Sequence, residues 1–165
     1  MAAIAAAASI MPVAAEVQPG TSSLLETIED NGIVVTYNHP DCATNGALGQ
    51  YRWAGFQREI RLCTGETIDA QDHNTVRHEV VHAIQHCVNA ARGTDENTPI
   101  VTNEAQFRAF IVDNLPQHMI KLITEAYPED QWLVELEAFA GANALSATEL
   151  EELFLEVCVA PESGI

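Results

Sequence analysis

Basic residues are scarce in this sequence. Seven Lys and Arg stand against 24 Asp and Glu, which gives the 165-residue chain a formal net charge of −17. A surface of that charge repels phosphate backbones and anionic lipid headgroups, so neither nucleic acid nor an acidic membrane is an expected partner. The acidic residues alternate with many apolar ones, which indicates a solvated acidic shell around a folded core rather than a disordered chain.

The sequence also lacks an apolar run of transmembrane length. Residues 1–15 are uncharged and rich in Ala, but the segment is too short to span a bilayer. Pro12 and the small residues before Glu16 are typical of a signal peptide with its cleavage site, although no Lys or Arg precedes the apolar run. We therefore expect a signal peptide at 1–15, an exported protein (periplasmic or extracellular) and a single domain over 16–165. The alternative is an Ala-rich helix or tail.

No CxxC pair is present, which argues against a cysteine zinc site. The four cysteines, Cys42, Cys63, Cys87 and Cys158, are an even number in a chain expected to be exported, and this favours two disulfides. Three pairings are possible. We predict Cys42 with Cys63 and Cys87 with Cys158; four buried thiols are the alternative if the protein is not exported.

Strand and helix patterns follow one another along the chain. β-branched and aromatic residues predict a strand at 33–37, and a hairpin of two strands is expected at 50–53 and 58–63, with Ile60 and Leu62 facing the core. Capping and proline signals predict the helices, at about 24–31, 72–91, 103–114, 116–126, 128–145 and 146–159. The fold class is therefore α+β, with a small antiparallel sheet followed by a helical bundle.

The segment His78-Glu79-Val80-Val81-His82 carries the clearest chemical signal. On a helix, two His four positions apart project from one face and can bind one zinc ion. Glu79 lies beside them, where it can accept a proton from a metal-activated water instead of binding the metal. The alternative is a polar stripe on a surface helix, but the neighbouring Val and Ala residues indicate a largely buried one.

A catalytic zinc site needs a third protein ligand and an open position. The metzincin extension is absent, because Gln85 and Val88 stand where Gly and the third His would be. His86 lies a further turn along the helix, about 6 Å too far along its axis. A carboxylate from a later helix is therefore expected.

A motif of the form HExxH followed by E-x-x-A on a later helix resembles the gluzincin metallopeptidases. The resemblance covers His78 to His82 and Glu135 to Ala138. It implies a zincin-like helical bundle in which Glu135 is the third zinc ligand. Phe139 departs from the pattern, since it occupies the place of an Asp or Asn that supports the ligands in the family.

Ala138 and Ala142 lie on the same helix face as Glu135, and such small side chains allow a close approach to the motif helix. Two other carboxylates remain possible as the third ligand. Glu104 follows His82 at a shorter gluzincin spacing, and Glu137 lies beside Glu135.

Tyr127 and His118 are candidate donors for the oxyanion that develops during hydrolysis. The resemblance further implies that the strand at Glu59–Cys63 binds an extended substrate along its edge. We therefore expect a zinc-dependent hydrolase that cleaves peptide bonds in a peptide or protein substrate, with Glu79 as general base. The alternatives are an inactive, zinc-stabilised secreted binding module and an interaction protein with an accidental motif.

Overall fold

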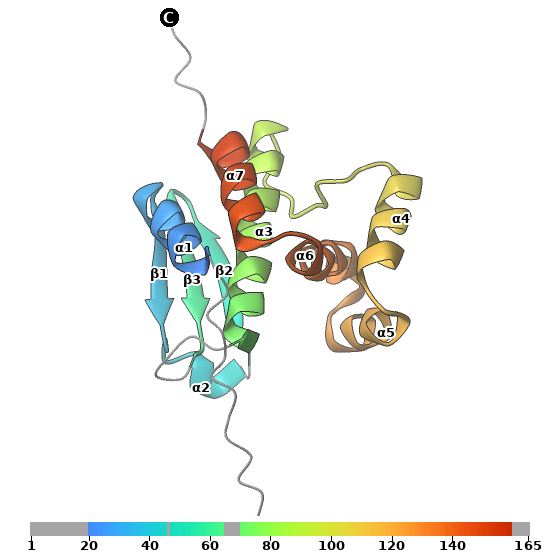
Figure 1. The fold of residues 1–165 in the computed structure, drawn as a ribbon, viewed down its shortest axis with the longest axis horizontal. Coiled ribbons are helices and arrows are strands. Elements are labelled where there is room, and N and C mark those ends of the chain that lie inside the picture. The colour runs from blue at the N-terminus through green and yellow to red at the C-terminus, as the bar shows by residue number, and fades with distance from the viewer. Residues whose placement is uncertain (1–19, 46, 65–69, 160–165) are drawn as a thin grey trace, which may run out of the picture.

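In the computed structural model the described residues are 20–45, 47–64 and 70–159. The predicted signal peptide at 1–15 lies outside them. The elements follow in the order α1 (Thr21–Asp30), β1 (Ile33–Tyr37), α2 (Cys42–Asn45), β2 (Gly49–Ala54), β3 (Gln57–Leu62), α3 (Ala70–Ala91), α4 (Glu104–Asn114), α5 (Gln117–Ala126), the 3₁₀ turn η1 (Glu129–Gln131), α6 (Trp132–Ala144) and α7 (Ala147–Cys158). A three-stranded sheet is followed by helices (Figure 1), which confirms the α+β class.

Local sequence signals explain where several helices begin and end. Ser146 and Glu149 form the predicted capping box at the start of α7, in which each side chain bonds the backbone N–H of the other. Gly32 follows α1 with a φ of 81°, a left-handed conformation that favours glycine. Three expectations are corrected. Helix α3 begins at Ala70, before the predicted start at residue 72; the short helix α2 lies between the strands expected at 33–37 and 50–53; and the 3₁₀ turn η1 occupies the start of the helix expected at 128–145.

The sheet is mixed, and the expectation of an antiparallel sheet is wrong in this respect. Its strand order is β1-β3-β2, with β2 and β3 forming the predicted antiparallel hairpin and β1 running parallel to β3. The hairpin was predictable because two residues connect its strands. The position of β1 depends instead on the packing of elements that are distant in the sequence. This packing places β3 between the other two strands.

Helices α1 and α3 pack on one face of the sheet, and α7 packs against both helices. Ile60 and Leu62 are fully buried there, as predicted from the alternation along the strand. The main core consists of residues from these helices and strands, including Leu24, Ile28, Ile33, Val76, Val80, Ile84, Leu150 and Phe154. A second core lies between α4, α5 and α6. Helix α6 therefore connects the two, with one side against α3 (Figure 1).

Small residues allow α6 to lie close to α3. Ala138 and Ala142 are fully buried, as expected. Gly141 adds a contact that the sequence reasoning missed, because a Cβ built on it would lie 3.0 Å from Cγ2 of Val81. The approach of the two helices brings side chains of α6 to the His78–His82 face of α3.

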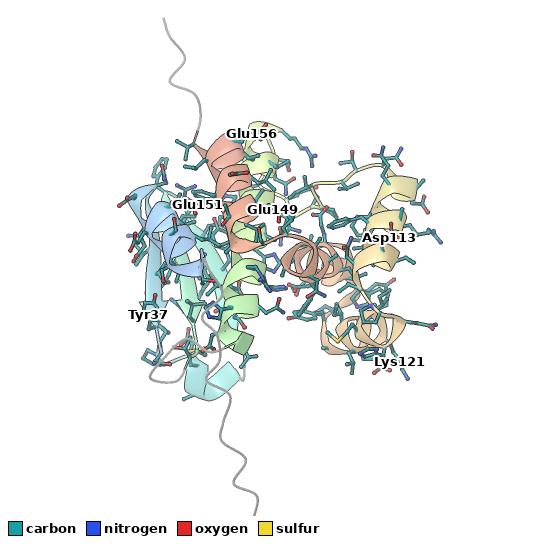
Figure 2. The ribbon with its side chains drawn as sticks, viewed as in Figure 1. Tyr37, Asp113, Lys121, Glu149, Glu151 and Glu156 are labelled. Atoms are coloured by element: carbon teal, nitrogen blue, oxygen red, sulfur yellow. A yellow bond between two sulfur atoms is a disulfide. The ribbon has the colours of Figure 1, made fainter. Side chains whose placement is uncertain are left out.

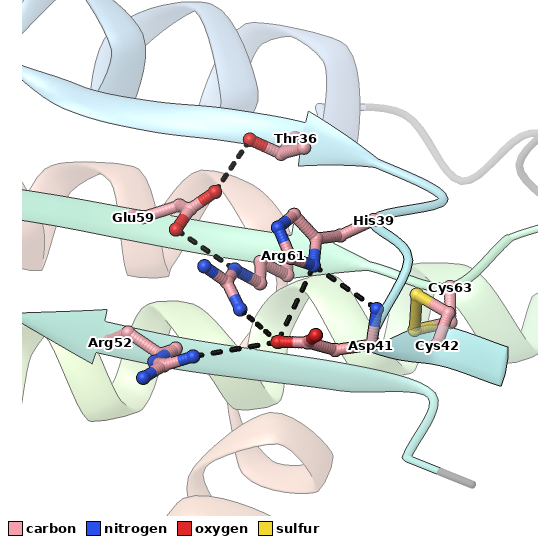
Figure 3. A network of polar contacts seen from close by, with 8 residues as sticks. All are labelled: Thr36, His39, Asp41, Cys42, Arg52, Glu59, Arg61 and Cys63. Carbon is pink, nitrogen blue, oxygen red and sulfur yellow. Dashed lines mark hydrogen bonds and ion pairs between the residues drawn. A yellow bond between two sulfur atoms is a disulfide. The ribbon is translucent and has the colours of Figure 1, made fainter. Parts of the chain in front are cut away.

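A polar network covers the opposite face of the sheet (Figure 3). Arg61 pairs with both Glu59 and Asp41, and Arg52 approaches Asp41 at 3.5 Å. Asp41 belongs to the connection between β1 and β2, so these contacts hold that connection against the sheet. The predicted Cys42–Cys63 disulfide is present at the same place.

The second predicted disulfide, Cys87–Cys158, joins α3 to α7.

Acidic side chains are found on several helices, with Glu149, Glu151 and Glu156 on α7 and Asp113 on α4 (Figure 2). Among the described residues, no helix combines the length and apolar character needed to cross a bilayer.

Candidate metal centre

Three side chains from α3 and α6 converge. His78 and His82 lie one turn apart on α3, and their Nε2 atoms are 3.1 Å from each other. Glu135, in the first turn of α6, places Oε2 3.4 Å from Nε2 of His78 and Oε1 3.5 Å from Nε2 of His82. The structure therefore brings together the three residues expected to bind the metal.

The spacing of these atoms suits a metal ion. Zinc in tetrahedral coordination holds nitrogen and oxygen ligands at about 2.0–2.1 Å, which separates two ligand atoms by about 3.3 Å. The three distances observed lie close to that value. Oε2 of Glu135 is also buried without a hydrogen-bond partner, which a bound cation would provide. Within the described part of the chain, this group of His78, His82 and Glu135 could hold a metal ion.

Glu135 and His82 each stabilise the charged form of the other. Burial would raise the pKa of Glu135, but the two imidazoles beside its carboxylate outweigh this effect and lower that pKa to about 2. Burial would likewise lower the pKa of His82, yet the nearby carboxylates of Glu135 and Glu79 outweigh it and the pKa is raised. The carboxylate is thus ionised at neutral pH, as a metal ligand must be.

Glu79 lies next to the cluster and is only 4% exposed. Burial raises the pKa of its carboxyl group, and the two nearby imidazoles act in the opposite direction. The backbone N–H of Tyr51 on β2 donates a hydrogen bond to this carboxylate. Glu79 is therefore held by strand β2 beside the metal-binding atoms and is not among them.

Gly49, at the start of β2, provides the space for Glu79. A Cβ built on Gly49 would lie 2.6 Å from Oε1 and 2.9 Å from Cγ of Glu79, and 2.5 Å from Cγ2 of Thr75. The sequence alone contained no sign of this role for Gly49. Its role follows from the close packing of β2 on α3, which no local pattern shows.

Two cavities, of about 340 and 230 Å³, open at the cluster. Both are lined by Ala47, Gly49, His78, Glu79 and Tyr127. The smaller cavity also contacts His82 and Glu135, whereas the larger one extends along Leu48 and Phe139 and is mainly apolar. The space beside the metal-binding atoms therefore has both a polar and an apolar wall.

Tyr127 lines both cavities, as its predicted role requires. Burial, followed by the negative charges of Glu135 and Glu79, raises the pKa of its phenol to about 12. The phenol therefore stays protonated and can donate a hydrogen bond. His118 is exposed in the first turn of α5 and lines neither cavity.

The two other candidates for the third ligand, Glu104 and Glu137, do not reach the histidines. Glu104 is exposed and its Oε1 is 2.9 Å from a guanidinium nitrogen of Arg108. Glu137 is buried, but its carboxylate accepts hydrogen bonds from the backbone N–H groups of Ile100 and Val101. Of the three candidates, Glu135 is the one whose carboxylate reaches the histidines.

His86 is not part of the cluster, which agrees with its expected position a further turn along the helix. Its Nδ1 lies 2.7 Å from the hydroxyl of Tyr51, and its ring stacks on Trp53 with centroids 4.8 Å apart. These contacts tie α3 to β2 one turn beyond His82.

The expectation that the strand at Glu59–Cys63 binds substrate along its edge is wrong. Both edges of β3 are paired, with β1 and β2, so Glu59–Cys63 cannot offer a free edge. The outer strand next to the cluster is β2. The chain order suggested β3 because it directly precedes the motif helix, but the hairpin folds so that β2 lies on the α3 side.

No protein-family profile matches this chain, and no similar protein was found among curated proteins or solved structures.

Proposed function

We propose that this protein is a zinc-dependent hydrolase that cleaves peptide bonds. The observation that carries the proposal is the convergence of His78, His82 and Glu135 beside the buried carboxylate of Glu79. The order of these residues in the sequence resembles that of the gluzincins, in which two His and one Glu bind the zinc. Two His and one carboxylate leave one position of a tetrahedral zinc site open for substrate.

Each residue of the site has a role in this reaction. The zinc ion would polarise the peptide carbonyl and make a water molecule more acidic. Glu79 accepts the proton of the attacking water, and the Tyr51 N–H orients its carboxylate. Tyr127 donates a hydrogen bond to the carbonyl oxygen as negative charge develops there.

Strand β2 is the proposed binding site for an extended peptide. Strand β3 pairs with only one edge of β2, and just before β2 the carbonyl of Leu48 accepts a hydrogen bond from Cys63 N on that side. In an antiparallel pair such bonds alternate, so the carbonyl of Gly49 points to the outer edge. A peptide lying along this edge would pass the metal-binding atoms.

Export is part of the proposal. The two disulfides are compatible with an oxidising compartment, because such bonds are rare in a reducing cytosol. The segment 1–15 has the composition of a signal peptide.

A second candidate function is a zinc-stabilised binding module without turnover. Phe139 favours it, since it leaves Nδ1 of His78 buried without a hydrogen-bond partner where the gluzincin pattern has a supporting Asp or Asn.

Metal analysis of the purified protein is the first test. We expect one zinc per chain, lost in Glu135→Ala and kept in Glu104→Gln, a matched change of an exposed glutamate. Zinc content near zero in the wild type, or unchanged zinc in Glu135→Ala, would contradict the assigned site.

The second test is cleavage of a broad peptide library. Glu79→Gln should lower the rate at least about 10²-fold while keeping zinc and fold, because the amide has nearly the same size but cannot accept the proton. Cleavage at the wild-type rate by zinc-loaded Glu79→Gln would remove Glu79 as the base. A zinc-loaded wild type that cleaves nothing would favour the binding module.

A further inference from the structure

The two histidines of the centre are supported differently. Nδ1 of His82 lies 2.8 Å from Oε1 of Gln85, a residue of α3 that is fully buried. Nδ1 of His78 is buried without a hydrogen-bond partner. The sequence reasoning considered Gln85 only as the residue that excludes a metzincin extension.

The orientation of the Gln85 amide is fixed by its other end. Its Nε2 donates to the backbone carbonyl of Val134 at 3.0 Å and to Oε2 of Glu137 at 2.9 Å. Val134 O can only accept a hydrogen bond, so the amide nitrogen must face it. Oε1 of Gln85 then faces His82 and can only accept, which requires the proton of the neutral imidazole to be on Nδ1.

This tautomer leaves a lone pair on Nε2 of His82. Nε2 is the atom that approaches Nε2 of His78 and Oε1 of Glu135. A neutral imidazole binds a metal through its unprotonated nitrogen, and a hydrogen bond at the other nitrogen orients the ring. The hydrogen bond to Gln85 therefore orients His82 for metal binding in the metal-free protein.

Glu137 anchors the arrangement. It is 2% exposed, and its carboxylate accepts hydrogen bonds from Ile100 N at 2.7 Å and Val101 N at 2.9 Å in addition to that from Gln85. Three donors satisfy the buried carboxylate without a metal. The connection between α3 and α4 is thereby attached to the amide that orients His82.

We propose that Gln85 and Glu137 are positioning residues for His82, and that they supply from the His82 side the support that Phe139 cannot give to His78. The inference rests on the proposed metal site. It assigns a function to two buried polar residues that neither bind the metal nor touch substrate.

Zinc affinity, measured by competition with a chromophoric chelator, provides one test. Gln85→Leu should weaken zinc binding about 10- to 100-fold, the range found when the partner of a ligating histidine is removed. Asn89→Leu is the matched control. Asn89 is a buried amide one turn further along α3 that holds the same connection through Thr98, with its Nδ2 2.8 Å from Thr98 O. It should lose stability without losing zinc affinity.

The tautomer of His82 is the second test and needs no metal. Imidazole ¹⁵N chemical shifts of the zinc-free wild type, recorded at a pH where His82 is neutral, should show its single proton on Nδ1, and Gln85→Leu should lose that preference. A neutral wild-type His82 with its proton on Nε2 would overturn the inference even if Gln85→Leu does not fold. Equal zinc affinity in wild type and Gln85→Leu would also overturn it. Because the tautomer is read without zinc or substrate, its result is independent of whether the protein is a peptidase.

Discussion

The phenyl ring of Phe139 packs on the imidazole of His78, with ring centroids 4.2 Å apart and planes inclined by 51°. The contact places an apolar group where the buried Nδ1 of His78 has no hydrogen-bond acceptor. Phe139→Asp should therefore provide an acceptor and tighten zinc binding by about 10-fold. The same change removes half-buried apolar contacts and should lower the free energy of unfolding by roughly 1–3 kcal/mol.

The control is Phe139→Leu, which also loses the aromatic ring but adds no acceptor. Zinc titration of both variants separates the two effects. If Phe139→Asp binds zinc no more tightly than Phe139→Leu, the unpaired Nδ1 of His78 does not limit metal affinity.

Gly49→Ala should displace the Glu79 carboxylate. The added Cβ would lie within 3 Å of two atoms of Glu79, so the side chain must move. We expect lower peptidase activity with full zinc content, because Glu79 is not a ligand, and overpacking should cost about 1–3 kcal/mol of stability.

Gly55→Ala is a suitable comparison for this variant. Gly55 has a φ of 60°, and a Cβ there would meet nothing within 4 Å. Its substitution should cost stability through backbone strain alone. Equal losses of activity in the two variants would show that Gly49 acts through stability and not through Glu79.

Stability should fall at alkaline pH because of Tyr51. Burial raises the pKa of this phenol to about 12, against the opposing charge of Arg58, while the unfolded chain has the ordinary value of 10. A raised pKa in the folded state gives stability that is present below pH 10 and is lost as the pH rises toward 12. Between pH 9 and 11 Tyr51 should account for a loss of about 1 kcal/mol, in addition to the loss from Tyr127, whose pKa is also raised to about 12. Urea unfolding at both pH values measures it, and Tyr51→Phe should show a loss smaller by that amount.

The two disulfides should contribute unequally. Cys87 and Cys158 are 71 positions apart and Cys42 and Cys63 are 21 apart. Closing the longer loop restricts the unfolded chain more, so replacing the first pair by Ala should cost about 4 kcal/mol and the second about 3 kcal/mol. Denaturant unfolding of the two double variants compares them. A larger loss for the Cys42–Cys63 pair would indicate that native contacts around α2 outweigh the chain entropy.

The sequence by itself determined the features that depend on neighbours along the chain. The spacing of His78 and His82 places both rings on one helix face, since 3.6 residues form a turn. The alternation at Ile60 and Leu62 determines which face of the strand is buried, and Ser146 with Glu149 determines where α7 begins. These follow from local geometry, which the chain cannot alter without breaking backbone hydrogen bonds.

The tertiary structure decided the rest. Among Glu104, Glu135 and Glu137, all compatible with the sequence, only the packing of α6 on α3 brings one carboxylate to the histidines. The contact between Gln85 and Glu137 joins residues 52 positions apart, and the parallel pairing of β1 with β3 crosses a whole strand. Such contacts have no periodic signal, because they depend on how the buried apolar faces of separate elements fit together.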